Sequence, residues 1–269
     1  DSHCLAIGLK QWVGRQLPFR RTLEDVRQKG GLVFIAHPDG QHRLFFRKAD
    51  HRWKRVDISG YDGIEVWSLL FDWAKQTNPF NLPIRYFRFP GNLSGPSPEA
   101  LNLWDRKAAR EHVTGVAGLD IHSLPCPSLD IARKFRYRTA FLILRNHLLI
   151  NQPLIRQREI DRELILAALT RGRLFFARDD LKKSQGFFFG CEDGQVMMGE
   201  WTVPGTRVLI KVPFLSSIRL VYNGTLLQEK EKVEWRTCLE KPGVYRVEVF
   251  LGKQPWIFSN HIYVSDKKC

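Results

Sequence analysis

Two short motifs hold the side chains of this chain that are best suited to binding a metal ion. Asp120 and His122 lie two residues apart in VTGVAGLDIHS, and His37 ends the apolar run of GGLVFIAHPDG. On an extended segment, side chains two residues apart point to the same side. Carboxylates and imidazoles are preferred ligands of divalent transition metals. The two motifs therefore indicate a metal site formed by these three residues.

The elements that carry these motifs are predicted to be buried strands. Each consists of small and apolar residues, with polar groups at the expected end of the strand. In parallel α/β folds, active sites lie at that end. Glu65 in IEVWS is a candidate to orient a ligating histidine, and an ordinary strand carboxylate is an equal alternative. Asp39 could reach the same edge, although its Pro-Asp-Gly sequence is also typical of a turn.

The chain is strongly basic. It has 42 Lys and Arg against 28 Asp and Glu, a net charge of +14, of which residues 1–155 carry +9 and residues 156–269 carry +5. This balance favours an anionic partner, either a phosphorylated small molecule or nucleotide, or a nucleic acid. Of two basic clusters, the second closely follows the D-x-H motif, and its Arg133 and Arg136 are candidate contacts to a substrate phosphate. Solvated surface charge is the simpler interpretation of both clusters. They are Arg43/Arg47/Lys48/Arg52/Lys54/Arg55 and Arg133/Lys134/Arg136/Arg138.

Cysteine usage and hydropathy favour a cytoplasmic protein. The five cysteines show no C-x-x-C spacing and are too few for a disulfide scaffold, so we expect reduced thiols. A bridge between Cys191 and Cys238 is the alternative. The sequence has no run of about 18 apolar residues and no leader with a basic start and an apolar core. We therefore expect neither a membrane span nor a signal peptide.

The pattern of predicted elements changes near residue 160. Before it, strands and helices alternate, which is typical of a parallel α/β sheet or barrel. After it, short strand-like runs separated by turn signals, such as Asn223-Gly224, predict an antiparallel, Ig-like β-sandwich. We expect one domain at 1–155, a connecting helix within 156–175 and a β-sandwich domain at 176–269. In the first part we predict a helix capped by Thr22, strands at 32–37, 64–67 and 113–122, a largely irregular segment from Asn78, and a helix capped by Ser97.

Four stretches of the first half together resemble the PHP (polymerase and histidinol phosphatase) family of metal-dependent phosphoesterases. They are DSHCLAIG around His3, GGLVFIAHPDG around His37, IEVWS around Glu65, and GLDIHS with Asp120 and His122. The second half resembles the region that follows this domain in many stand-alone members. It contains FRYRTAFLILRNHLL, a helix with an AL-x-x-GR ending, and a β-domain. The order and spacing of these stretches make the resemblance fairly specific, and it covers nearly the whole chain.

The resemblance implies a distorted β/α barrel with two or three divalent ions, commonly manganese, zinc or iron, at the carboxyl ends of its strands. By motif, the metal ligands would be His3, His37, Asp120 and His122. The family's earlier ligand motifs precede the histidine that matches His3, so we expect an incomplete barrel without its first strands. The implied enzyme is a metal-dependent phosphoric ester hydrolase that cleaves phosphomonoesters or phosphodiesters through a metal-bound hydroxide. The alternative is a catalytically inactive module of the same origin that binds nucleic acid or another polyanion.

Overall fold

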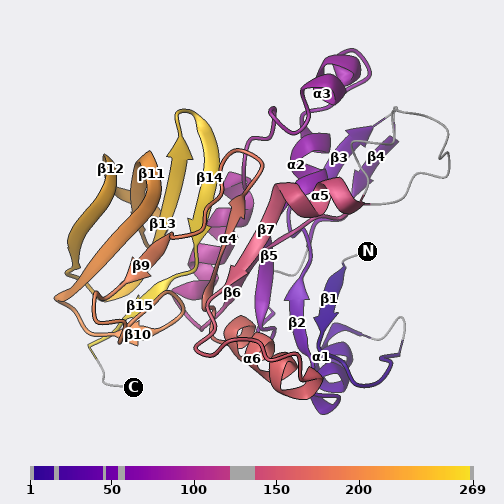
Figure 1. Ribbon diagram of the computed structural model, residues 1–269. Coiled ribbons are helices and arrows are strands. Elements are labelled where there is room, and N and C mark those ends of the chain that lie inside the picture. The colour runs from indigo at the N-terminus through magenta and orange to yellow at the C-terminus, as the bar shows by residue number, and fades with distance from the viewer. Residues whose placement is uncertain (1–2, 15–17, 45–46, 54–57, 122–136, 267–269) are drawn as a thin grey trace.

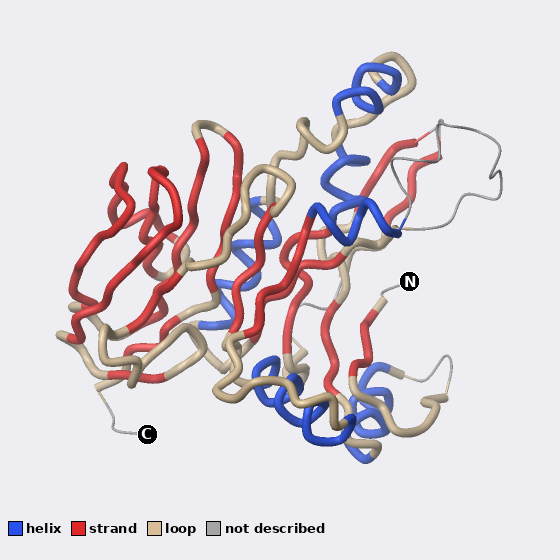
Figure 2. The backbone as a smooth tube through the Cα atoms, in the orientation of Figure 1, coloured by secondary structure: helices blue, strands red, loops and turns tan. Residues whose placement is uncertain are grey.

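Two β-sheets organise the part of the chain that the computed structural model describes, residues 3–14, 18–44, 47–53, 58–121 and 137–266 (Figures 1 and 2). In the smaller sheet, three parallel strands lie side by side, and one edge strand runs antiparallel to its neighbour. The antiparallel strand places its first residue beside the carboxyl end of that neighbour. The strand order is β1 (Cys4–Ile7), β2 (Leu32–Ile35), β5 (Gly63–Ser68) and β6 (Thr114–Gly118).

Helices and a short hairpin connect the strands of the smaller sheet. Helix α4 is capped by Ser97, whose hydroxyl accepts a hydrogen bond from the Ala100 N–H at 3.1 Å, and Pro98 takes the first helical position. The helix buries Trp104 completely against the sheet. Helix α3 projects away from the rest of the molecule (Figure 1). The connecting elements are α1 (Phe19–Gln28), β3 (Gln41–Leu44), β4 (Arg47–Asp50), α2 (Leu69–Lys75), α3 (Leu82–Arg88) and α4 (Pro98–Ala108).

Among the described residues, nine strands form the larger sheet, which is antiparallel except for the pairing of β10 with β15. Its longest hairpin, β11 with β12, turns at Asn223 and Gly224, whose φ angles of 48° and 81° suit a tight hairpin turn. β11 pairs with β9 near one end and with β13 near the other, so the sheet wraps around its own apolar core. Two helices, α5 (Tyr137–Ile143) and α6 (Arg158–Thr170), flank its first strand. The strands are β7 (Leu144–Leu148), β8 (Leu174–Arg178), β9 (Phe188–Gly190), β10 (Trp201–Thr202), β11 (Thr206–Tyr222), β12 (Thr225–Leu239), β13 (Gly243–Leu251), β14 (Gln254–Ser259) and β15 (Ile262–Val264).

The expected fold class, an incomplete PHP-type barrel followed by an Ig-like sandwich, is wrong. Within the described ranges the smaller sheet has four strands and stays open, whereas a filled β/α barrel closes with about eight. The next strand that the structure describes after β6 is β7, and it pairs with β8 in the larger sheet. The strands of the second half belong to one hydrogen-bonded sheet rather than to two facing sheets. The fold is therefore a mixed α/β arrangement of two sheets.

Asparagine side chains cover the edge of β6 where a barrel would add a further strand. The Asn260 amide accepts from the Gly115 N–H at 2.7 Å and donates to the Gly115 carbonyl at 2.9 Å. Asn146 pairs in the same way with Ala117, with both distances 2.8 Å. Asn260 also donates to the Leu174 carbonyl at 2.9 Å. These amides satisfy backbone groups that would otherwise be unpaired at the sheet edge, and they join the two sheets.

We expect Asn260→Ala to lower the free energy of unfolding by about 2–3 kcal/mol, because it leaves the buried N–H and carbonyl of Gly115 without their side-chain partner. Asn146 is exposed, so water can replace its amide, and Asn146→Ala should cost only about 1 kcal/mol. Denaturant unfolding of both variants measures the difference. Equal, small losses would show that the side-chain pairing does not stabilise this edge.

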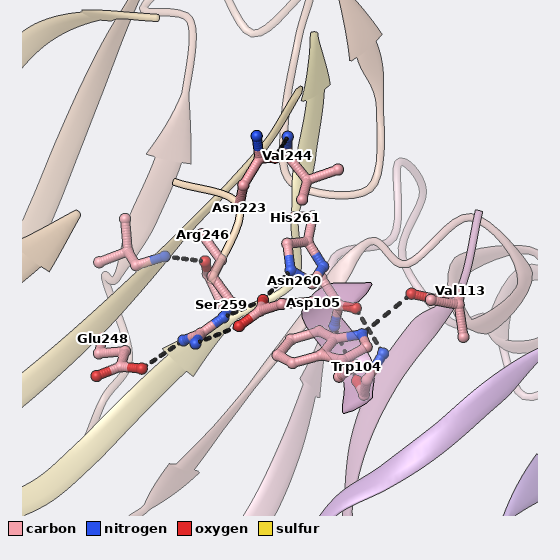
Figure 3. Close-up of polar contacts among 12 residues, drawn as sticks. Trp104, Asp105, Val113, Asn223, Val244, Arg246, Glu248, Ser259, Asn260 and His261 are labelled. Carbon is pink, nitrogen blue, oxygen red and sulfur yellow. Dashed lines mark hydrogen bonds and ion pairs between the residues drawn. The ribbon is translucent and has the colours of Figure 1, made fainter. Parts of the chain in front are cut away.

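A buried charged network joins α4 to the larger sheet (Figure 3). Arg246 on β13 donates to the two carboxylate oxygens of Asp105 on α4 at 2.7 and 2.9 Å, and to Glu248 at 2.5 Å. His261 Nε2 donates to Asp105 at 2.7 Å. Complete burial lowers the pKa of His261, so the ring is neutral and carries its proton on the nitrogen that faces Asp105. The larger sheet thus fixes the position of α4 through a single carboxylate.

The described residues bear on two further expectations. None of the helices in these ranges is long and apolar enough to span a membrane.

Cys191 and Cys238 are both free. β11 separates them, since β9 and β12 pair with its opposite edges. Two strand spacings amount to about 9–10 Å, and a disulfide requires Cα atoms within about 7 Å. The alternative of a Cys191–Cys238 bridge is therefore wrong.

Candidate metal centre

The antiparallel pairing of β1 with β2 brings His3 and His37 together. Cys4 lies opposite Ile35, so His3 precedes β1 at the same edge where His37 follows β2. The His3 carbonyl accepts from the Ala36 N–H at 3.1 Å, which fixes the two segments to each other. His3 Nδ1 lies 3.2 Å from His37 Nε2. Two nitrogens that share one tetrahedral zinc ion at 2.0–2.1 Å would be about 3.3 Å apart, so this separation suits both a hydrogen bond and a shared ion.

A third imidazole, His51, lies beside this pair. Its ring centroid is 5.2 Å from that of His3 and 6.1 Å from that of His37. The hairpin of β3 and β4 returns the chain here, and the His51 N–H donates to the Gly40 carbonyl at 2.7 Å. Sequence reasoning missed His51, which falls in the first basic cluster and has no motif of its own.

Glu65 projects from β5 toward the same edge and is almost completely buried, with 3% exposure. Its Oε2 accepts from the His37 N–H at 3.0 Å, so Glu65 holds the backbone of His37 rather than its ring. Its Oε1 accepts no hydrogen bond of acceptable geometry from the described residues. Burial raises the pKa of Glu65 to about 7, although the His37 N–H and the nearby Ser68 hydroxyl favour the ionised form. A cation beside Oε1 would supply the missing partner.

Asp120 follows β6 and completes this edge. Both Asp120 and His37 have positive φ, 47° and 29°, which is unusual for residues other than glycine and recurs at functional sites. Burial lowers the pKa of His37, and the neighbouring Asp120 carboxylate opposes this effect. Asp120 also lines a cavity of 570 Å³ whose wall includes Arg145. Arg145 is a basic group at this cavity that the sequence pattern did not indicate.

The donor set fits a divalent cation in its chemistry but is not a complete site within the described residues. Neutral imidazoles and a buried carboxylate oxygen without a partner are suitable donors. In this part of the chain no three His, Cys, Asp or Glu side chains are close enough to form a ready metal site. The structure places His3, His37, Glu65 and Asp120 at the same edge of the smaller sheet. The other predicted site residues, His122, Arg133 and Arg136, lie outside the described residues.

Asp39 lies beside this centre, at the wall that separates two cavities of 340 and 280 Å³. Its carboxylate is 3.4 Å from Lys75 Nζ, which is also 3.2 Å from Glu99. Arg52 and Arg106 line the smaller cavity. Asp39 therefore pairs with the Lys75 ammonium group beside the candidate metal centre.

Another cluster, of Ser184, His147 and Asp179, has the composition of a hydrolase triad but not its geometry. Ser184 Oγ and Asp179 Oδ2 both lie 3.0 Å from the same nitrogen, His147 Nε2. In a catalytic triad the carboxylate binds the opposite ring nitrogen. Ser184 is completely buried, and its hydroxyl donates to Asp179 at 2.7 Å. This cluster supports the loop after β8 and offers no accessible nucleophile.

Comparison with protein-family models, with curated proteins and with solved structures finds no match to this chain. The interpretation of the site therefore depends on its own residues and their geometry.

Proposed function

We propose that this chain is a metal-dependent phosphoesterase related to the PHP family. The observation that carries the proposal is the meeting of His3 and His37, 3.2 Å apart, with the buried and partly unpaired carboxylate of Glu65. Buried acceptors without a partner are rare in folded proteins, and a bound ion is one explanation for such a group. The motif around Asp120 and His122 supports the same interpretation, a metal-dependent phosphoesterase.

The residues that would hold divalent ions are His3, His37, Asp120 and, through its free oxygen, Glu65. A divalent ion there would neutralise phosphoryl charge and lower the pKa of a coordinated water. Glu65 would also keep the turn after β2 in place through the His37 N–H. In the hydrolysis, a water oxygen bonds to phosphorus and the bond from phosphorus to the ester oxygen breaks. The proton from water ends on the leaving alcohol.

Basic side chains near the centre suit an anionic ester. Arg106 lines the smaller cavity beside Asp39, and Arg145 lines the cavity beside Asp120. Arg145 is held by the Phe141 carbonyl at 2.9 Å and by Asp179 at 3.5 Å, which leaves one terminal guanidinium nitrogen for a phosphate. Together with the net charge of +14, these groups favour phosphate esters over neutral substrates.

A second candidate function is binding of single-stranded nucleic acid without catalysis. Helix α3 and the turn before it expose Phe80 (94%) and Phe87 (73%), and Arg88 ends the helix. Exposed aromatic rings beside arginine can stack on nucleobases. In that case binding of an oligonucleotide would weaken steeply with salt, and divalent metal would produce no turnover.

The experiment that tests the proposal is metal analysis of the purified chain, followed by hydrolysis assays with p-nitrophenyl phosphate and its diester in manganese. We expect at least one manganese, zinc or iron ion per chain and hydrolysis that a chelator abolishes. A chain that takes up no metal from excess manganese, and hydrolyses neither ester, would overturn the proposal and leave the nucleic-acid candidate.

A further inference from the structure

The larger of the two cavities beside Asp39 borders the candidate metal centre. It lies between the end of β5, helix α2 and the segment that leads into α4, and has a volume of 340 Å³. Its wall includes Phe71, whose ring centroid is 4.6 Å from that of His37. Trp67, Pro96 and Pro98 make much of the remaining wall apolar. A cavity of this size accommodates a small organic ring.

The backbone donors around this cavity are already engaged. The Ser94 and Gly95 N–H groups donate to Asp72 at 2.9 and 3.0 Å. At the start of α4, Pro98 has no N–H, and the Ala100 N–H is bound by Ser97 Oγ. The helix start therefore lacks the free donors of an anion site.

The charged side chains of the wall also disfavour an anion. Lys75 is paired with Asp39 and Glu99, and the Asp72 carboxylate adds a further acid. Acids thus outnumber the lysine at this cavity. A second phosphate or a carboxylate placed there would be repelled.

Ser68 differs from the apolar and charged side chains of the wall, because it is an uncharged polar group. It is 8% exposed, it lines the cavity, and its Oγ makes no hydrogen bond of acceptable geometry with the described residues. Its proton favours the ionised form of the neighbouring Glu65 carboxylate, so Oγ keeps a lone pair that can accept one hydrogen bond from a ligand. The cavity therefore offers partly apolar walls and, at Ser68, a buried polar contact.

We infer that this cavity binds the organic group of the phosphate ester, an uncharged ring with one hydrogen-bonding group that meets Ser68. The inference builds on the proposed phosphoesterase function and narrows its substrates to esters of cyclic or aromatic alcohols. Esters that carry a second anionic group on the alcohol are disfavoured.

The first test compares kcat/KM for benzyl phosphate and ethyl phosphate in manganese, because both are esters of primary alcohols and differ in the ring. We expect benzyl phosphate to be preferred at least about tenfold, since the ring gains apolar burial. Ser94→Trp fills the cavity from its exposed rim and should remove most of this preference, whereas the exposed control Ser59→Trp should keep it. A wild-type ratio near one, or a ratio that Ser94→Trp leaves unchanged, would overturn the inference.

The second test does not require hydrolysis, so it separates failure of this inference from failure of the proposed function. Binding of benzyl alcohol to the chelated protein is followed by tryptophan fluorescence, because Trp67 lines the cavity. We expect saturable quenching in the wild type and in Ser59→Trp, and at least about tenfold weaker binding in Ser94→Trp. If the chain proves to have no phosphoesterase activity, such binding would still support the subsite. Absence of saturable binding, or equal binding by all three proteins, would contradict it.

Discussion

Replacing His37 by alanine is expected to lower the affinity of the chain for manganese, and its kcat/KM for p-nitrophenyl phosphate, by at least about 100-fold. Residues that only orient a metal ligand typically contribute 10–100-fold to affinity, and loss of a ligand should cost at least as much. His37 is the central residue of the candidate centre, because its ring meets His3 and its backbone is held by Glu65. Metal titration and steady-state kinetics measure the two effects.

Two further variants make this result specific. Glu65→Gln keeps the shape of the side chain but removes its charge, so it should also weaken metal binding if Oε1 faces a cation. His112→Ala removes an imidazole that bonds to the Arg171 and Gly199 carbonyls, away from the centre, and should retain metal and activity. Full metal content and full activity in His37→Ala would show that the centre is assigned to the wrong residues.

The sequence could indicate His37, Glu65 and Asp120 because each is adjacent to, or part of, a continuous apolar strand. Such strands pair in parallel and bring their carboxyl ends to one edge of the sheet. The local pattern of apolar residues is therefore enough to predict that these three residues lie at that edge. His51 and Lys75 could not be found in this way. His51 reaches the centre through the β3–β4 hairpin, and Lys75 reaches it from the end of α2. Both positions depend on tertiary contacts with the turn after β2.

Several elements could be predicted where a local signal agreed with the final structure. The cap at Ser97 and the hairpin turn at Asn223 are confirmed. The predicted cap at Thr22 is wrong, because α1 begins at Phe19 and the Thr22 hydroxyl bonds back to the Pro18 carbonyl. The irregular segment predicted from Asn78 contains α3. Pro83 lies in its first turn, where a missing N–H costs nothing.

The arrangement of the two sheets could not be predicted from the sequence pattern. A parallel run of strands predicts further parallel strands, and nothing in the local sequence of β6 shows that asparagines from distant segments cover its edge. Asn146 and Asn260 lie on segments of the larger sheet, so their role depends on how the two sheets meet. The prediction of a barrel was wrong because of this contact between the two sheets, and not because any single element was predicted wrongly.

Replacing Asp105 by alanine is expected to lower the free energy of unfolding by about 3–5 kcal/mol, the cost of removing one partner from a buried ion pair. Arg246 and His261 would both lose the carboxylate that accepts their hydrogen bonds (Figure 3). Glu248 would remain as a partner of Arg246 alone, at a less buried position. Denaturant unfolding measures the loss. Glu163→Ala, an exposed substitution on α6, serves as the control and should change stability by less than about 0.5 kcal/mol.

The pH dependence of this loss identifies its origin. Burial alone would raise the pKa of Asp105, but hydrogen bonds from His261 and Arg246 outweigh it and lower the pKa well below its ordinary value. A carboxylate with a lowered pKa in the folded state contributes stability above its unfolded pKa of about 3.9, and this stability is lost as the pH falls further. The difference between wild type and Asp105→Ala should therefore be complete at pH 7 and shrink below about pH 4. A difference that persists unchanged at low pH would mean that α4 is joined to the larger sheet by the packing of the Asp105 side chain and not by its negative charge.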